Sequence, residues 1–206
     1  MSEPNEIADH ADPVIDGIWH WQVSNSNIGG ATSSSHALQD DGRSVLIDPV
    51  RLAPDALEEL PAPHAVLLTA KCHQRSAWRY RAQFNAEVWA PVGTTPMDGD
   101  PDHRYAEGDV LPGGLRAVRT PGPQEVHYCL LLEREPGVLF CSDLLTHYPE
   151  RGLDFVPLRF HEDPDATRRS VEGLLDLPFE VLCLDHGVPL TSDAKPAIQG
   201  LLERTA

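Results

Sequence analysis

The chain has 206 residues, of which 41% are hydrophobic, enough apolar material for one well-packed domain. Its formal net charge is −16 and its 16 lysines and arginines are scattered, which excludes the cationic surface that nucleic acids and anionic membranes require. No apolar run approaches the ~20 residues that span a bilayer, and the acidic opening residues do not resemble a signal peptide. We therefore expect a soluble cytoplasmic protein without nucleic-acid or membrane partners, with residues 1–15 as a flexible leader and residues 16–206 as a single domain.

The first half of the chain alternates predicted strands with predicted helices, which is typical of an α/β fold. Residues 16–23 alternate apolar and polar side chains as a strand does, and residues 40–43 have hairpin-turn chemistry. The continuous apolar run at residues 64–69 suits a strand buried on both faces. The other expected elements are strands at 36–39, 44–48 and 87–90, helices at 54–60 and 76–84, and a polar loop at 24–35.

The second half begins with strand candidates and ends with helices. Asp163 followed by Pro164 starts a helix well, because a carboxylate caps the helix and proline suits its first position. An edge strand near the N-terminus is expected to allow pairing with a second copy, as a homodimer. The expected elements are strands at 115–119, 126–133, 137–141 and 180–184, helices from 163 onward and at 192–203, and a loop at 144–162.

Polar residues gather where the predicted buried strands end. Residues 71–75 follow one strand, Asp143 follows a second and His186 follows a third, while residues 120–125 form a tight turn. Active sites of α/β sheets collect at strand ends, so we expect any chemistry to gather around Asp143 and His186. The sequence has no Walker loop, GxSxG or GxGxxG, so nucleotide-binding and serine-hydrolase functions have no support.

The order of these motifs resembles that of the metallo-β-lactamase fold superfamily over roughly residues 16–203. DGRSVLIDP resembles the early hairpin, VLLTAKCHQR stands where the family has THxHxDH, and GDVLPGGLRAVRTPGP resembles the stretch that ends in TPGH. GVLFCSDLL resembles the strand that carries the bridging aspartate, and VLCLDHGVPL the strand that ends in the last metal-binding histidine. The resemblance implies a four-layer αββα sandwich, with two mixed sheets face to face and helices outside.

Most of the metal ligands that the resemblance implies are replaced in this chain. Asp143 and His186 keep the family's residue types. A catalytic zinc requires three protein ligands and an open position, so these two alone would hold a metal weakly. The remaining ligand positions carry Ala70, Cys72, Gln74, Arg75 and Pro123.

Neighbouring residues offer a rearranged single-metal site. His73, Asp143 and His186 are the candidate metal ligands and catalytic residues, and Glu125 or His127 could complete the set. The metal would be Zn, Fe or Mn, weakly held. In the alternative, no metal binds, and Asp143 and His186 hold the loops through hydrogen bonds. The candidate substrate-binding residues are Arg75, Glu125, His127 and His147.

Arg75 and Cys72 each have alternative interpretations. Arg75 stands where a second metal would bind, so its guanidinium either pairs with Asp143 or binds substrate. Cys72 is a thiolate ligand, a nucleophile activated by His73, or simply small and polar. The other three cysteines lie in apolar runs, and we expect them to be reduced, buried thiols.

Two functions therefore remain open. The first is a divergent hydrolase that acts on a small ester, thioester or lactone through a rearranged or single-metal site. The second is a catalytically inactive relative that binds a small molecule or a protein partner in the vestigial cleft.

Overall fold

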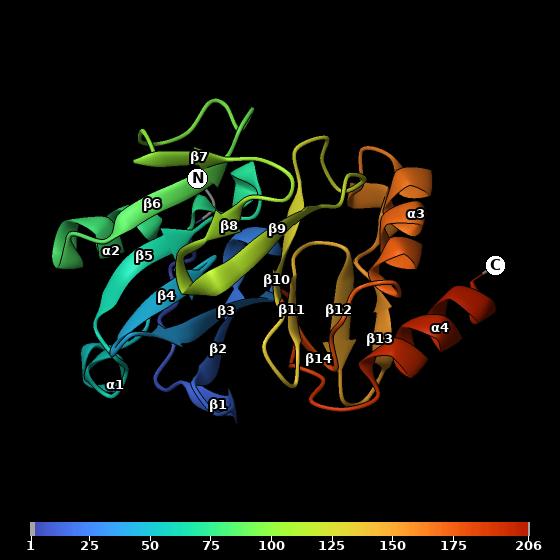
Figure 1. Cartoon of the computed structure of the whole chain (residues 1–206), viewed down its shortest axis with the longest axis horizontal. Helices are drawn as coiled ribbons and strands as arrows, with labels where there is room; N and C mark the ends of the chain where they lie inside the picture. The colour runs from blue at the N-terminus through green and yellow to red at the C-terminus, as the bar shows by residue number, and fades with distance from the viewer. Residues whose placement is uncertain (1–2, 206) are drawn as a thin grey trace.

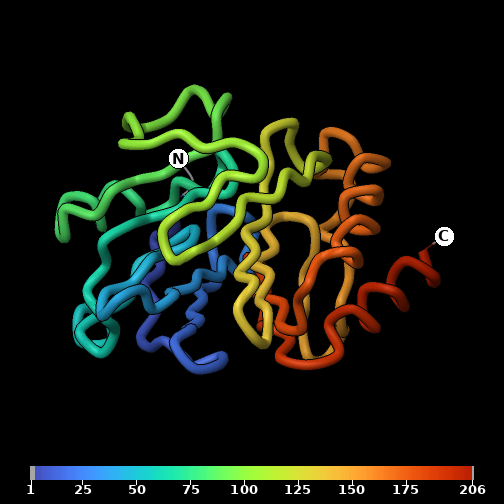
Figure 2. The backbone as a smooth tube through the Cα atoms, in the orientation of Figure 1, coloured from blue at the N-terminus to red at the C-terminus, as the bar shows by residue number. Residues whose placement is uncertain are grey.

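The computed structural model describes residues 3–205 as two facing β-sheets with helices on both outer sides (Figure 1). The α/β class and the four-layer αββα arrangement are therefore confirmed. The backbone trace shows that the residues from blue to green build the first sheet, and the later residues, toward red, build the second (Figure 2). Among the described residues, no helix combines the length and apolarity needed to cross a membrane.

The first sheet is mixed, with antiparallel pairing through its fourth strand and parallel pairing beyond it. Helices α1 (Pro54–Glu58) and α2 (Ala77–Phe84) belong to this half of the molecule. Its strands, in spatial order, are β1 (Asp12–Ile15), β2 (Ile18–Asn25), β3 (Ala31–Asp40), β4 (Arg43–Ile47), β5 (Pro63–Leu67), β6 (Glu87–Pro91) and β7 (His103–Tyr105).

The second sheet is antiparallel except for one parallel pair. Its strands, in spatial order, are β14 (Val181–Leu184), β11 (Val138–Cys141), β10 (Tyr128–Leu132), β9 (Leu115–Arg119) and β8 (Val110–Leu111). Helices α3 (Pro164–Leu174) and α4 (Ala194–Arg204) cover it, beside a hairpin of β12 (Leu145–Tyr148) and β13 (Gly152–Phe155). Short 3-10 helices lie at Ser26–Ile28, Lys71–Gln74, Pro112–Gly114 and Leu158–Phe160.

The continuous apolar runs of the sequence become strands buried on both faces. In β5 and the residue after it, Ala65 and Leu67 join the core between the two sheets, while Val66 and Leu68 join the core that contains α1 and α2. The same alternation places Leu130 of β10 between the sheets and turns its neighbour Leu131 toward α3 and α4. Each sheet therefore separates two apolar layers.

Two segments expected to be loops contain strands. Part of the predicted loop at 24–35 belongs to β3, because its serines are buried and hydrogen-bonded. The hydroxyls of Ser34 and Ser35 donate to the carbonyls of Gly187 and Asp48 at 2.8 Å each. The predicted loop at 144–162 contains the β12–β13 hairpin, in which Leu145 and Leu153 are buried.

The first described residues, within the expected flexible leader, pack against the first sheet's helical side. The Glu3 carboxylate accepts hydrogen bonds from Ser76 Oγ at 3.0 Å and from Arg79 Nε at 2.5 Å. The backbone of Ala8 pairs with the backbone around Leu52.

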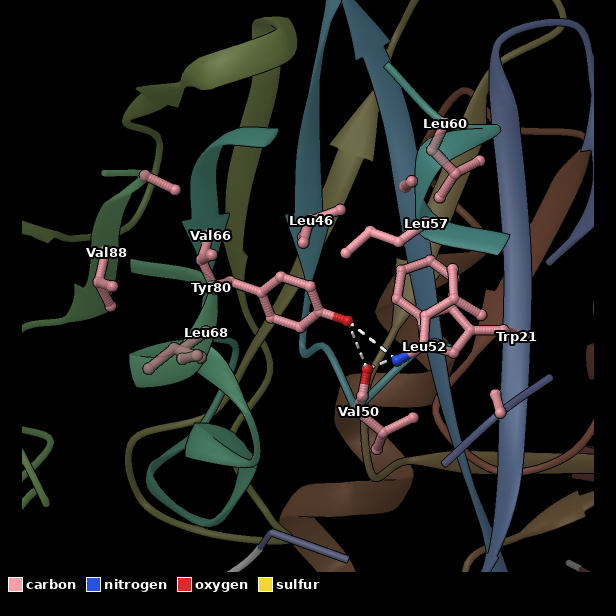
Figure 3. Close-up of a cluster of buried hydrophobic side chains, with 14 of the residues drawn as sticks. Trp21, Leu46, Val50, Leu52, Leu57, Leu60, Val66, Leu68, Tyr80 and Val88 are labelled. Carbon is pink, nitrogen blue, oxygen red and sulfur yellow. Dashed lines mark hydrogen bonds between the residues drawn. The ribbon is translucent and has the colours of Figure 1, made fainter. Parts of the chain in front are cut away.

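A tyrosine fixes the backbone that follows β4. The hydroxyl of Tyr80, on α2, donates to the Val50 carbonyl and accepts from the Leu52 amide, both at 3.1 Å (Figure 3). The Trp21 indole donates to the same Val50 carbonyl at 3.0 Å. These bonds tie α2 and β2 to the segment directly after Asp48.

We expect Tyr80→Phe to lower the free energy of unfolding by roughly 1–3 kcal/mol, because the buried Leu52 amide loses its acceptor. Urea denaturation measures this change. Tyr148→Phe is the control, since Tyr148 is only partly buried, and it should cost less. Equal losses in the two variants would contradict the prediction.

Two histidines lie buried opposite each other on β2 and β3. His20 and His36 are cross-strand partners with ring centroids 5.2 Å apart, and His36 is only 1% exposed. Within the described chain, neither ring nitrogen of His36 has a hydrogen-bond partner. Burial lowers the pKa of His20 to about 4 and, with the charges of His20 and Arg75, lowers the pKa of His36 well below its usual value.

This pair should make the protein sensitive to acid. Because both folded pKa values lie below the unfolded value near 6.5, the unfolded chain binds more protons as the pH falls below 6.5, and stability is lost in that direction. Each histidine that stays neutral in the folded protein lowers the free energy of unfolding by about 1.4 kcal/mol for every pH unit below its unfolded pKa. We expect the unfolding free energy of His36→Leu to fall less than that of the wild type between about pH 7 and 5. His10→Leu, on the surface, should follow the wild type, and parallel profiles for all three proteins would refute the assignment.

Candidate functional site

The ends of four strands bring a set of ionisable side chains together where the two sheets meet. Asp48 follows β4, and His73 lies in the 3-10 helix that follows β5. Asp143 follows β11, and Asp185 and His186 follow β14. Because β4 is parallel to β5 and β11 is parallel to β14, each pair of strands ends at one edge of its sheet. The polar clusters at these strand ends therefore converge.

His73 occupies the centre of this set and is buried. Its Nδ1 donates to Asp48 Oδ2 at 3.0 Å and lies 2.8 Å from Asp185 Oδ2. Its Nε2 forms an ion pair with Asp143 Oδ2 at 3.1 Å. Burial alone would lower the pKa of His73, but the neighbouring charges, led by Asp143, raise it well above its usual value. The three surrounding carboxylates therefore favour the imidazolium form of His73.

Besides His73, three further side chains contact Asp143 or its backbone. Its Oδ1 accepts from His186 Nε2 at 3.0 Å, its Oδ2 accepts from the Cys72 thiol at 3.5 Å, and its amide donates to His127 Nε2 at 3.1 Å. Burial alone would raise the pKa of Asp143. The charge of His73 and the hydrogen bonds from His186 and His73 outweigh burial and hold this pKa well below its usual range. The carboxylate is therefore ionised, and 17% of its side chain reaches solvent.

The imidazoles around Asp143 are oriented through their Nδ1 atoms. His186 Nδ1 donates to the Thr32 carbonyl at 2.5 Å, and His127 Nδ1 donates to the Thr120 carbonyl at 2.8 Å. Burial lowers the pKa of His127 to about 4, so this ring is neutral and its Nε2 can accept the Asp143 amide.

Two buried carboxylates, Asp48 and Asp185, support His73 and were not expected there. The sequence predicts no chemical role for Asp48, although Asp48 and Asp185 directly follow apolar strands. Asp48 also accepts the Thr69 amide at 2.9 Å, and the Thr69 hydroxyl binds its other oxygen. Burial and the nearby Asp48 charge raise the pKa of Asp185 to about 6, whereas the charge of His73 lowers the pKa of Asp48 against the effect of burial.

Arg75 lies buried beneath the site. Its guanidinium donates to the carbonyls of Ser34 and Asp48 at 2.6 and 2.8 Å and forms an ion pair with Asp185 at 3.5 Å. Its backbone φ of 38° with ψ of −118° is strained for a residue with a side chain. The guanidinium contacts hold this conformation in place.

The structure thus brings His73, Asp143 and His186 together, with His127 beneath them, as the rearranged site requires. Glu125 does not join these residues. Its side chain is 79% exposed and forms an ion pair with Arg119. His147 is on β12, where its Nδ1 donates to the Val188 carbonyl at 2.9 Å and its amide binds the His186 carbonyl.

Comparison of the sequence with protein-family models and with curated proteins gives no match. Solved structures do match. A metallo-β-lactamase from Pontibacter korlensis superposes with a TM-score of 0.73 at 14% identity, over 94% of this chain and 98% of that one. A metallo-β-lactamase family protein from Thermus thermophilus superposes with a TM-score of 0.69 at 20% identity, over 94% of this chain and 80% of that one. The metallo-β-lactamase FIM-1 from Pseudomonas aeruginosa, in its mono-zinc form, superposes with a TM-score of 0.69 at 12% identity, over 100% of this chain and 99% of that one.

The chain has the metallo-β-lactamase fold. Its order of motifs predicted this fold, and the similarity of the solved structures along nearly the whole chain confirms it. At two positions where the resemblance implies metal ligands, Ala70 and Pro123 have no metal-binding side chain. Gln74 is engaged elsewhere, since its Oε1 accepts the Asp98 amide at 2.7 Å.

The remaining donors of this metallo-β-lactamase fold fit a single divalent metal. His73 and His186 each have Nδ1 bound to an acceptor, the Asp48 carboxylate and the Thr32 carbonyl, and each has Nε2 at the Asp143 carboxylate. Such outer contacts are what fix the tautomer and ring orientation of metal-binding histidines. Two imidazoles and a carboxylate also match the donor types that zinc accepts.

Asp48 should be essential for the stability of this cluster. We expect Asp48→Asn to lower the free energy of unfolding by roughly 3–5 kcal/mol, because it leaves the charge of buried His73 incompletely paired. Chemical denaturation of the purified variant measures the loss. Asp41→Asn is a matched control, since Asp41 has the same φ of 45° but is exposed, and it should cost almost nothing. A cost of under about 1 kcal/mol for Asp48→Asn would contradict the ion-pair account.

Proposed function

We propose that the protein is a hydrolase that holds one divalent metal at Asp143, His73 and His186 and cleaves a small ester, thioester or lactone. The observation that carries this proposal is the shared arrangement of His73 and His186. In both residues, Nδ1 is bound to an acceptor and Nε2 lies about 3 Å from the same ionised carboxylate. A metal bound there would supply hydroxide near neutral pH and polarise a carbonyl oxygen.

The side chains of the site have separable roles in this proposal. Asp48 orients the His73 ring, the Thr32 carbonyl orients the His186 ring, and His127 fixes the backbone of Asp143. Asp143 and His186 expose 17% and 15% of their side chains, so a small substrate can approach them. The net charge of −16 disfavours nucleic acids as substrates.

One observation favours the inactive alternative, in which the cleft binds a small molecule or a protein partner. The His73 imidazolium and the Arg75 guanidinium already oppose the carboxylates of Asp48, Asp143 and Asp185. The charges are therefore nearly balanced without a metal. A metal held by Nε2 of His73 and Nε2 of His186 must displace the proton from each of these atoms to solvent, so metal binding and protonation of these two atoms exclude each other.

Metal analysis distinguishes the two functions. We expect protein purified without chelator, then incubated with excess Zn²⁺ or Mn²⁺ and desalted, to retain about one metal per chain by inductively coupled plasma mass spectrometry. His186→Ala should lose this metal because an imidazole donor is removed. His147→Ala should keep it, since His147 lies on the neighbouring β12–β13 hairpin and binds the Val188 carbonyl.

Hydrolysis of a model ester, thioester and lactone then tests the reaction itself. Activity that chelation removes and metal restores supports the hydrolase. Wild-type protein that retains no metal after incubation rules out the metal-dependent hydrolase and leaves the binding function. Metal in the wild type without activity toward any of the three compounds argues against the proposed substrate class.

A further inference from the structure

Cys72 lies beside the proposed ligands and has no role in the function proposed above. It precedes His73 in the 3-10 helix Lys71–Gln74 and is partly exposed, whereas the other three cysteines are buried. Its Sγ is 3.5 Å from Asp143 Oδ2. Cys72 Sγ and single donor atoms of His73 and Asp143 all lie within 4.8 Å of one another. This compact set is independent of His186, which approaches the other oxygen of Asp143.

We propose that Cys72 is a thiolate ligand of the metal at Asp143 and that this ligand makes the site selective for Zn²⁺ over Mn²⁺. The inference rests on the proposed single-metal site and adds to it a third type of donor. The thiolate would join His73, Asp143 and His186, and a zinc ion that expands to five ligands keeps one position open for water.

The separations between the donor atoms suit zinc. Tetrahedral bonds of about 2.3 Å to sulfur and about 2.0 Å to oxygen place those two ligands about 3.5 Å apart. Cys72 Sγ and Asp143 Oδ2 are 3.5 Å apart. His73 Nε2 is 3.1 Å from the same oxygen, close to the separation of about 3.3 Å that nitrogen and oxygen ligands would have. Two of the three separations therefore already suit a shared ion, and the third, between Cys72 and His73, is at most 4.8 Å.

The alternative roles of Cys72 are less well supported by its surroundings. A cysteine nucleophile needs a base that can take the thiol proton. Both ring nitrogens of His73 lie against carboxylates, at Asp48 and Asp143, so neither is left as an acceptor for Cys72. Coordination instead removes the thiol proton and the Nε2 proton to solvent. The resulting thiolate is a soft donor that favours zinc, whereas Mn²⁺ prefers oxygen ligands.

Cobalt titration tests this assignment without any substrate. Co²⁺ substituted for zinc shows weak visible bands in any low-symmetry site, and an intense near-ultraviolet charge-transfer band only when a thiolate is bound. We expect wild-type protein to show both at one equivalent of Co²⁺. Cys72→Ser should keep the visible bands and lose the near-ultraviolet band. Lys71→Ala, next in sequence but without a donor near Asp143, should behave as the wild type.

Affinities measured by competition with a chromophoric chelator test the selectivity. Cys72→Ser should weaken Zn²⁺ binding roughly tenfold or more, since even outer-shell changes cost roughly 10–100-fold, and should change Mn²⁺ binding little. Cys72→His, which supplies an imidazole instead, should restore Zn²⁺ binding without the near-ultraviolet band. Circular dichroism confirms that each variant is folded.

The possible failures are distinguishable. Stoichiometric Co²⁺ binding without the near-ultraviolet band, or a band that persists in Cys72→Ser, overturns the role of Cys72 and leaves the single-metal proposal standing. No Co²⁺ binding by the wild type overturns both. Equal losses of Zn²⁺ and Mn²⁺ affinity in Cys72→Ser would refute the claimed selectivity.

Discussion

The buried cation of His73 is the interaction on which the rest of the site depends. Its imidazolium contacts the Asp48 carboxylate, which follows a strand of the first sheet, and the Asp143 and Asp185 carboxylates, which follow strands of the second. Buried charges are tolerated only when they are paired and hydrogen-bonded. The two sheets can therefore close over this region only in the arrangement that brings all these groups together. The ion-pair cluster thus fixes the relative position of the strand ends.

The backbone near the cluster carries the corresponding strain. Asp48 and Arg75 both have positive φ values, 45° and 38°, although neither is glycine. Such conformations persist only where the surrounding contacts hold them. The Asp48 side chain is held by Thr69 and His73, and its carbonyl accepts from the Arg75 guanidinium. The two strained residues therefore stabilise each other, and Tyr80 and Trp21 fix the segment that follows.

The layers of the fold could be predicted from the sequence because burial on both faces leaves a local signal. Continuous apolar runs such as residues 64–69 identify the central strands. Polar residues just after these strands likewise pointed to His73, Asp143 and His186. The polar loop expected at 24–35 was wrong for its last residues, because Ser34 and Ser35 find their hydrogen-bond acceptors at Gly187 and Asp48. A local sequence pattern cannot indicate hydrogen-bond acceptors that lie so far away in the sequence.

The partners of His73 were missed for the same physical reason. Asp48 is 25 residues away in the sequence, and its contact with His73 exists only after β4 and β5 have paired. Asp185 stands next to the more conspicuous His186, and only the folded structure shows that its carboxylate turns toward His73. A residue type at a strand end therefore indicates where a site forms, but the protonation states within it depend on which charges the tertiary fold assembles.

This dependence also explains what holds the geometry of the site. Asp143 is ionised, only partly exposed and close to other carboxylates, so the cluster requires a positive charge near Nε2 of His73. A proton on Nε2 meets that requirement, and so does a divalent metal that replaces it. In both cases Nδ1 keeps its hydrogen bond to Asp48, and His186 keeps its hydrogen bond to Thr32. The geometry is thus compatible with either cation. In the proposed metal site the affinity would depend on the donors that surround Asp143, among which Cys72 differs most from imidazole and carboxylate.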